Sequence, residues 1–284
     1  MVIRPISKTL EFSRMRTGEN SREALSTGYY SLDPYINLAK KYLMIVSGYP
    51  GSGKSEWLDG VLVNMNTLHN WKTLYYSPEN NPLEEHMAKL AEKFIGKQIS
   101  KFSSEDNDKA LEYLEHNFSW IDPEEATIEH LFALADEEKK ARGLDVFVID
   151  PWNAILHKRG HLREDEYLME ILSRILIFAR RRNILVCIVA HPRTPPPDAK
   201  GNIRPATLDS ISGGSMWWNK ADYGVICSRP DMEKNQIAIS IQKIKQKWMG
   251  SVGRSLLDYD PLSGRFKDPE SELYLLPNDI VTPF

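Results

Sequence analysis

The sequence predicts an α/β fold: a mostly parallel central sheet, helices on both faces of it, and antiparallel strands at the C-terminal end. Apolar runs of strand length alternate with helical patterns over the first two thirds of the chain. Each of these strands is a continuous apolar run, which is typical of parallel strands buried on both faces. Beyond residue 220 the chain shows only strand patterns separated by turn signals, which favours antiparallel strands there.

Four buried strands and five helices are expected to alternate in the first part of the chain. The strands lie at 42–48, 73–78, 144–150 and 184–190. The helices lie at 54–66, 82–95, 105–117, 125–141 and 164–182. Gly48 ends the first strand, Pro78 stops the second, and Gly143 follows the fourth helix. Apolar side chains at helical spacing, such as Leu83, Met87 and Leu90, support the second helix.

A long surface loop is expected after the fourth strand. The stretch 191–215 holds five prolines and little periodicity. Strands follow at 222–228, 236–243 and 252–259, separated by turn signals. We expect one domain over residues 26–284, preceded by a polar, locally basic segment over residues 1–25. That segment is either a frayed terminus or an arm that docks on a neighbouring subunit.

Composition excludes several classes of protein. The 284 residues carry 36 basic and 39 acidic side chains, and the net charge of −3 excludes a globally basic nucleic-acid binder but not a local basic lining. The sequence contains no run of 18 apolar residues, so no membrane span is expected. The N-terminus shows no secretory signal and no evident organellar targeting signal. Cys187 and Cys227 both lie in apolar strands, which argues against a disulfide or zinc site and favours a reducing compartment. The expected location is the cytoplasm of a bacterial or phage-infected cell.

The strongest motif is the glycine-rich segment between the first strand and the first helix. It fits the pattern G-x-x-x-x-G-K-[ST] in the strand–helix context that a phosphate-binding loop requires. Its backbone amides would cradle phosphate oxygens, Lys54 would reach the β- and γ-phosphates, and Ser55 would hold Mg²⁺. The candidate nucleotide-binding residues are Gly48, Pro50, Gly51, Ser52, Gly53, Lys54, Ser55 and Glu56.

Three polar residues that follow other strands complete a predicted ATP-hydrolysing site. Asp150 ends the third strand and would be the second organiser of Mg²⁺. Glu79 ends the second strand, which we expect beside the phosphate-loop strand, and it would orient the attacking water; the alternative is an N-cap for the next helix. His191 ends the fourth strand and would sense the γ-phosphate; the alternative is a structural hydrogen bond.

Eight strings in fixed order resemble the C-terminal domain of Twinkle-type helicases, within the DnaB-like superfamily of hexameric replicative helicases. They span about residues 26–267, nearly the whole chain. The strings are STGYYSLD (26–33), SGYPGSGKSEW (47–57), SPEN (77–80), VIDPWN (148–153), EDEY (164–167), VAHPR (189–193), DSISGGSMWWNKAD (209–222) and KIKQKWMGSVG (243–253).

The resemblance implies a RecA-like ATPase core that forms a homohexameric ring. Such a ring moves 5′ to 3′ along single-stranded DNA during replication, with ATP and Mg²⁺ bound between subunits. A primase or polymerase is an expected partner. Because only about 25 residues precede the core, we expect no priming activity; the chain is either a stand-alone helicase or part of a longer protein.

The resemblance also implies residues that act beside the phosphates and the base. Relatives place an arginine finger three residues before the G-x-x-G turn, and here that position holds Lys247. Lys247 or Lys245 would therefore act as the finger in the active site of the neighbouring subunit. No acidic residue near them in the sequence would pair with them instead. The alternative is that these lysines form a solvated basic edge of the strand. Lysine lacks the planar fork of arginine and stabilises a phosphoryl transition state less specifically. Arg229 would pack on the adenine, with Tyr259 as its stacking companion.

Cations in the loops after the third and fourth strands are the candidate contacts to DNA. They would hold backbone phosphates without reading sequence. These residues are Lys158, Arg159, Arg193, Lys200, Arg204 and Lys220. The pair Trp217-Trp218 is interpreted as core packing rather than base stacking.

Two other functions stay open at this point. A RecA-like ATPase that DNA stimulates, but that does not unwind duplexes, would keep Lys54, Glu79 and Asp150. A ring scaffold that binds nucleotide but barely hydrolyses it would account for the missing finger arginine. Steady-state ATPase assays with and without single-stranded DNA separate the scaffold from both enzymes.

Overall fold

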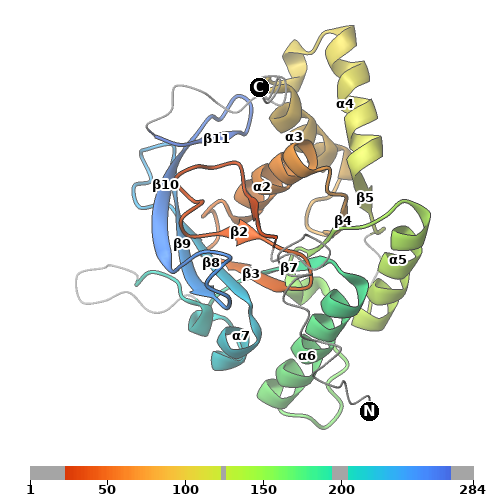
Figure 1. Ribbon diagram of the computed structural model, residues 1–284, viewed down its shortest axis with the longest axis vertical. Helices are drawn as coiled ribbons and strands as arrows, with labels where there is room; N and C mark the ends of the chain where they lie inside the picture. The colour runs from red at the N-terminus through yellow and green to blue at the C-terminus, as the bar shows by residue number, and fades with distance from the viewer. Residues whose placement is uncertain (1–22, 123–125, 194–203, 270–284) are drawn as a thin grey trace, which may run out of the picture.

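The predicted α/β fold is confirmed. The computed structural model describes residues 23–122, 126–193 and 204–269. Figure 1 shows a central sheet with helices on both of its faces and a blue antiparallel ribbon at one side. Of the expected N-terminal segment, residues 1–22 lie outside the described part of the chain. No helix within the described ranges is long and apolar enough to cross a membrane.

The central sheet has nine strands in the order β11-β10-β9-β8-β3-β7-β6-β4-β5. Neighbouring strands in the series β8-β3-β7-β6-β4-β5 are parallel. Neighbouring strands in the series β11-β10-β9-β8 are antiparallel. They span β3 (Leu43–Ser47), β4 (Thr73–Tyr76), β5 (Phe118–Trp120), β6 (Val146–Ile149), β7 (Leu185–Ala190), β8 (Tyr223–Ser228), β9 (Gln236–Ile244), β10 (Gly253–Tyr259) and β11 (Phe266–Lys267). A separate antiparallel pair joins β1 (Leu25–Ser26) and β2 (Asn37–Leu38).

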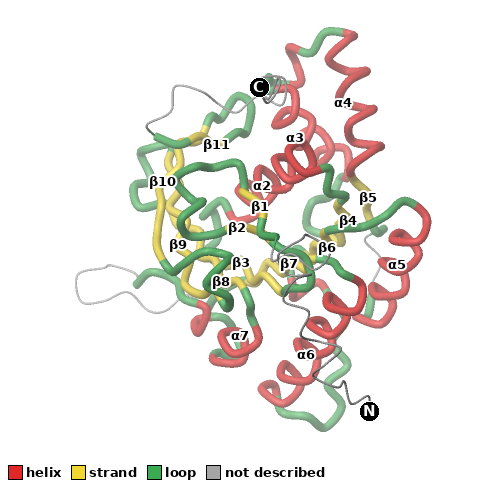
Figure 2. The backbone as a smooth tube through the Cα atoms, viewed as in Figure 1, coloured by secondary structure: helices red, strands yellow, loops and turns green. Residues whose placement is uncertain are grey.

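Within the described residues, six α-helices cover the sheet in two groups of three (Figure 2). The first group is α2 (Lys54–His69), α3 (Leu83–Ile95) and α4 (Ser104–Asn117), and the second is α5 (Ile128–Ala141), α6 (Glu164–Arg182) and α7 (Ser215–Lys220). Each group packs its apolar side chains into a separate hydrophobic cluster with one face of the sheet. Short 3₁₀ turns occur at Ile99–Lys101, Trp152–Ala154 and Leu208–Ser210.

The expected place of the second strand in the sheet is wrong. β4 does not lie beside β3, because β7 and β6 stand between them. The hydrophobic pattern identifies a buried strand but carries no information on which buried strand becomes its neighbour. No sequence signal indicated β5 either, because its three residues begin directly where α4 ends.

The parallel strands bring four functional segments to one edge of the sheet. β3, β4, β6 and β7 all run in the same direction, and their carboxyl ends therefore meet at the same edge. The phosphate-binding loop follows β3, Glu79 follows β4, Asp150 follows β6 and His191 follows β7. The fold thus gathers residues that are up to about half the chain apart in sequence.

Candidate active site

The phosphate-binding loop has the backbone geometry that its glycines allow. Gly53 caps the N-terminus of α2 with a φ of 83°, in the left-handed region that favours glycine. A Cβ at Gly48 would lie 2.2 Å from the carbonyl oxygen of Cys227, so no side chain fits there. The hydroxyl of Ser52 is buried and has no hydrogen-bond partner among the described residues. A buried, unsatisfied hydroxyl in a loop at a helix N-terminus fits a bound phosphate.

The side chains of Lys54, Ser55 and Asp150 meet beneath this loop. Lys54 is only 6% exposed, and its ammonium donates to the carbonyl of Tyr49 at 3.2 Å. Burial lowers the pKa of Lys54, and the carboxylates of Asp150 and Glu79 oppose that shift. Burial raises the pKa of Asp150 to about 6, and its hydrogen bond with Ser55 opposes the shift. A hydroxyl beside a carboxylate is the oxygen donor set that Mg²⁺ prefers, so these two residues fit the metal.

Asp150→Asn is expected to stabilise the fold. A carboxylate whose folded pKa lies above its unfolded pKa loses stability as pH rises through that interval, here from about 4 to about 6. At pH 7 the ionised Asp150 therefore costs up to about 3 kcal/mol, which asparagine avoids. Denaturant unfolding at pH 5 and at pH 7.5, without added metal, should show an advantage for the variant that grows with pH. A variant no more stable than wild type at pH 7.5 would contradict this.

Glu79 and His191 face each other at the same edge of the sheet. The Nε2 atom of His191 lies 3.9 Å from Oε2 of Glu79. The Glu79 side chain is 60% exposed and does not cap α3, whose N-cap is Pro82 without a side-chain bond. Burial and the Lys54 ammonium lower the pKa of His191, while Glu79 opposes the shift, so the imidazole is neutral at pH 7. The N-cap alternative for Glu79 is therefore not what the structure shows.

A cavity of about 180 Å³ lies on the other side of the phosphate-binding loop. Arg229 and Tyr259 both line it, as the base-binding role predicted from the sequence requires. The Arg229 guanidinium is held by the carbonyls of Met232 and Lys234, at 3.2 and 3.3 Å. The remaining lining residues are Gly51, Ser52, Gly53, Glu56, Asn235, Gln236, Ile237 and Phe266.

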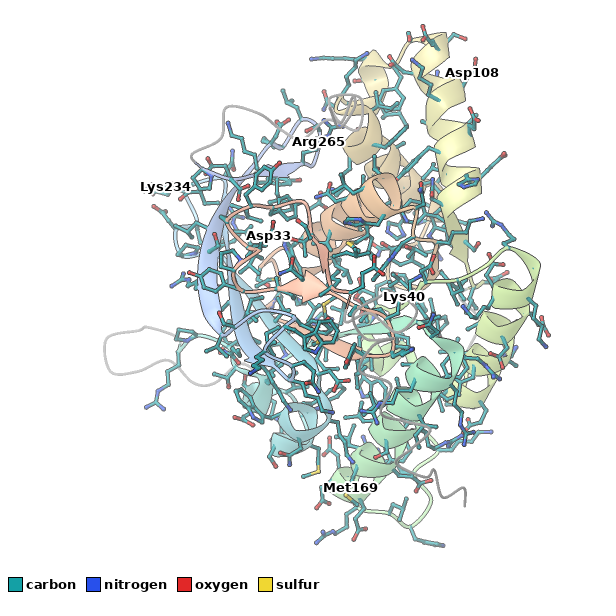
Figure 3. The ribbon with its side chains drawn as sticks, in the orientation of Figure 1. Asp33, Lys40, Asp108, Met169, Lys234 and Arg265 are labelled. Carbon is teal, nitrogen blue, oxygen red and sulfur yellow. The ribbon has the colours of Figure 1, made fainter. Side chains whose placement is uncertain are left out.

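Sequence reasoning missed Lys93 and Arg265, which pack beside this cavity. Glu56 pairs with the buried ammonium of Lys93 and accepts a hydrogen bond from the Tyr259 hydroxyl at 3.2 Å. Arg265, labelled in Figure 3, reaches from the β10–β11 turn to the C-terminal end of α3 and donates to the carbonyls of Lys93 and Phe94. No sequence signal marked Lys93, because a lysine on a helix is usually solvated.

The expectation that no acid pairs with the two candidate finger lysines is wrong for Lys245. Its ammonium lies 2.7 Å from Oδ1 of Asp222, a residue with 0% exposure. Asp222 precedes β8, and its other oxygen accepts from the backbone amide of Leu43 at 3.1 Å. The two residues are 23 positions apart in sequence, and the antiparallel pairing of β8 with β9 brings them together. Within the described ranges, no carboxylate pairs with Lys247, which is exposed in the following turn.

The structure brings only some of the candidate DNA-contacting cations together. Lys158 and Arg159 are exposed in the loop after β6, and Arg193 is exposed just after β7, at the edge that carries the phosphate-binding loop. Arg204 is exposed at the far end of the same β7–α7 loop, while Lys200 lies outside the described residues. Lys220 ends α7 directly before β8, at the opposite edge of the sheet, and is not brought near the others.

The two adjacent tryptophans have different environments. Trp217 is fully buried, whereas Trp218 is 37% exposed. The core-packing interpretation is therefore right for Trp217 and does not describe Trp218.

Comparison with known proteins gives a curated relative and similar solved structures. The Twinkle homolog protein, chloroplastic/mitochondrial, of Arabidopsis thaliana is 31% identical over 261 residues. That match covers 86% of this chain and 36% of the relative, so the chain spans about a third of the relative's length. The resemblance to Twinkle-type proteins is confirmed. No protein-family model matches the chain.

Two solved structures share the fold of this chain. The first is an ATPase domain, which superposes with a TM-score of 0.76 at 15% identity and covers 95% of this chain and 100% of its own. The second is a DnaB-like replicative helicase, solved in a study of its interactions with primase, which superposes with a TM-score of 0.72 at 16% identity. That match covers 95% of this chain and 68% of the helicase chain. Identities this low establish the common RecA-like ATPase fold alone.

Proposed function

We propose that this chain is an ATP-dependent DNA helicase that moves 5′ to 3′ along single-stranded DNA as a homohexameric ring. The observation that carries the proposal is the gathering of the phosphate-binding loop, Asp150, Glu79 and His191 at the edge from which two cation-bearing loops emerge. A site for ATP hydrolysis at this edge would lie beside loops suited to a phosphate backbone. The Twinkle-type relative and the helicase folds support the same assignment.

The residues of the site divide the work of hydrolysis. The loop amides and Ser52 would bind the phosphates, Lys54 would stabilise the charge on the transferring phosphoryl, and Ser55 with Asp150 would hold Mg²⁺. A metal ion held by these two residues would supply charge neutralisation for the phosphates. Glu79 would orient water, and a neutral His191 within 3.9 Å of it can donate a hydrogen bond to the γ-phosphate without repelling Lys54. Arg229 and Tyr259 would bind the base.

The DNA would run along the loops after β6 and β7. Among the candidate cations, Lys158, Arg159, Arg193 and Arg204 lie at the same edge as the phosphate-binding loop, where the Tyr49 hydroxyl donates to the Arg204 carbonyl. We propose that they contact backbone phosphates, which gives binding independent of sequence. We also propose a primase or polymerase as partner and the cytoplasm as location. The Arabidopsis relative is instead named chloroplastic/mitochondrial.

Strand displacement tests the proposal directly. The wild-type chain should displace the strand from a forked duplex with a 5′ single-stranded tail when ATP and Mg²⁺ are present. Glu79→Gln should still bind ATP and DNA but should not unwind, because a general base contributes about 10²–10⁴-fold to rate. A matched control is Glu84→Gln, an exposed carboxylate in the first turn of α3. DNA-stimulated ATPase without any displacement would instead support the non-unwinding ATPase.

One observation favours a second candidate function. Lys247 stands where relatives carry an arginine finger, and lysine offers a point charge rather than a planar fork. A ring scaffold that needs nucleotide only to assemble would tolerate this replacement. It predicts nucleotide-dependent oligomers whose ATPase stays near background with and without single-stranded DNA.

A further inference from the structure

Two segments that the nucleotide site does not use meet at a single side chain. The EDEY segment starts α6 at Glu164, and the SISGGS segment contains Ser212, 48 residues later. The Ser212 hydroxyl donates to Oε1 of Glu164 at 2.6 Å. Both residues line a cavity of about 230 Å³ that also reaches His191.

Ser212 also belongs to the stem of the long loop after β7. Pro192 and Ile211 form an isolated antiparallel bridge, and the Arg193 amide donates to the carbonyl of Ser210 at 2.8 Å. The guanidinium of Arg193 donates to the Ser212 hydroxyl at 2.9 Å. This stem therefore begins one residue after His191.

The backbone at Ser212 is fixed independently of its side chain. The indole of the fully buried Trp217 donates to the Ser212 carbonyl at 2.6 Å. Removal of the hydroxyl should therefore cut the link to Glu164 without releasing the stem.

The same loop is tied to the phosphate-binding loop at a second point. The hydroxyl of Tyr49, the second residue of the phosphate-binding motif, donates to the carbonyl of Arg204 at 2.8 Å. One loop thus contacts the nucleotide side through Tyr49 and follows His191 directly, while its stem contacts the start of α6. The segment before α6 is the loop that carries Lys158 and Arg159.

We propose that the Ser212–Glu164 hydrogen bond is a positioning contact that makes the two candidate DNA loops respond together to the nucleotide site. DNA held by either loop can influence hydrolysis if the loop moves with residues of the nucleotide site. The β7–α7 loop follows His191 and contacts Tyr49, and the β6–α6 loop follows Asp150. Glu164 and Ser212 join the two loops, so that a movement of one is passed to the other. This inference rests on the proposed helicase function and assigns Ser212 and Glu164 no contact with ATP or DNA.

Measurement of ATPase with and without a single-stranded oligothymidine tests the proposal on the full chain. Ser212→Ala and Glu164→Ala should each keep basal turnover and lower the stimulation by DNA at least about fivefold, the lower end of typical coupling between sites. The double variant should be no worse than Ser212→Ala alone, because Glu164→Ala removes only a contact that Ser212→Ala has already removed. Ser212→Thr and Glu164→Gln keep a hydroxyl and an acceptor, and should retain stimulation.

Asp165→Ala is the matched control. Asp165 is also in the first turn of α6, but its carboxylate pairs with the exposed Arg163, at 2.9 Å, rather than with the loop stem. This control should leave stimulation unchanged. If Ser212→Ala does not fold, the Glu164 variants decide: loss with alanine and retention with glutamine supports the proposal, and equal behaviour overturns it.

Wild-type stimulation in the folded Ser212→Ala variant would also overturn the proposal. So would an additive loss in the double variant, since independent defects add. A wild-type chain that DNA does not stimulate at all would count against the helicase function itself, and is therefore distinguishable from failure of the positioning contact.

Discussion

Lys54→Ala is expected to lower ATP turnover by at least about 10²–10³-fold, the range for loss of one preorganised electrostatic group. The ammonium of Lys54 is buried beside the phosphate-binding loop and donates to the Tyr49 carbonyl, so the protein holds this charge in a fixed position. Neither Asp150 nor His191 can replace it, because one is anionic and the other is neutral at pH 7. Steady-state phosphate release with saturating ATP and Mg²⁺ measures the loss.

The matched control for this variant is Lys72→Ala. Lys72 precedes β4 at the opposite edge of the sheet, where its ammonium donates to the carbonyl of Arg142 at 3.0 Å. It should leave turnover within about twofold of wild type, because it is far from the phosphates. The Lys54 variant should stay folded, since burial already disfavours the charged form of that lysine. Near-wild-type turnover in a folded Lys54→Ala protein would contradict the assignment of the nucleotide site to this edge of the sheet.

The parallel half of the fold could be predicted from the sequence because its signals are local. A run such as LMIVS is too apolar for a one-sided strand, and the glycine-rich turn after it has a fixed geometry. The polar residues after β3, β4, β6 and β7 could be placed at one edge, since parallel strands all end on the same side. Glu79 lies close to His191 even though β4 is not beside β3. Both residues follow parallel strands, and such strands end at the same edge of the sheet whatever their order.

Contacts between distant segments could not be predicted. The pairing of Lys245 with Asp222 depends on how β9 returns beside β8, and the pairing of Lys93 with Glu56 depends on how α3 packs on α2. In both cases the sequence shows only an ordinary lysine. The hydrogen bond between Ser212 and Glu164 is similar, because it joins a loop stem to a helix start through tertiary structure alone.

The position of Lys245 helps to decide whether Lys245 or Lys247 is the candidate finger that acts on the nucleotide of a neighbouring subunit. Lys245 and Asp222 lie where β8 begins, and the phosphate-binding loop approaches Cys227 near the end of that six-residue strand. Asp222 and Cys227 are five residues apart along the strand, which at about 3.3 Å per residue separates them by about 17 Å. Lys245 therefore cannot reach a phosphate at the loop of its own subunit, and its pairing with Asp222 leaves Lys247 as the candidate finger.

Lys247→Ala is expected to lower ATP turnover strongly while leaving the nucleotide site of its own subunit intact. Arginine fingers supplied in trans contribute about 10³–10⁵-fold in other phosphoryl-transfer enzymes, and a lysine should give less because it lacks the bidentate fork. Lys247→Arg should keep the ATP turnover of the wild-type chain or exceed it.

Lys245→Ala should instead lower thermal stability, because it leaves the carboxylate of Asp222 buried without its cation.

Subunit mixing distinguishes a shared site from a damaged one. Lys54→Ala subunits have a dead site but an intact Lys247, and Lys247→Ala subunits have the reverse. Each variant alone should be nearly inactive, but mixed rings should recover part of the ATPase where an intact phosphate-binding loop meets an intact Lys247. The recovered activity should vary with the mixing ratio and be greatest at intermediate ratios, since only mixed interfaces contribute. Absence of recovery in rings shown to contain both variants would contradict a shared site, and full activity of Lys247→Ala alone would make this lysine part of a solvated basic edge.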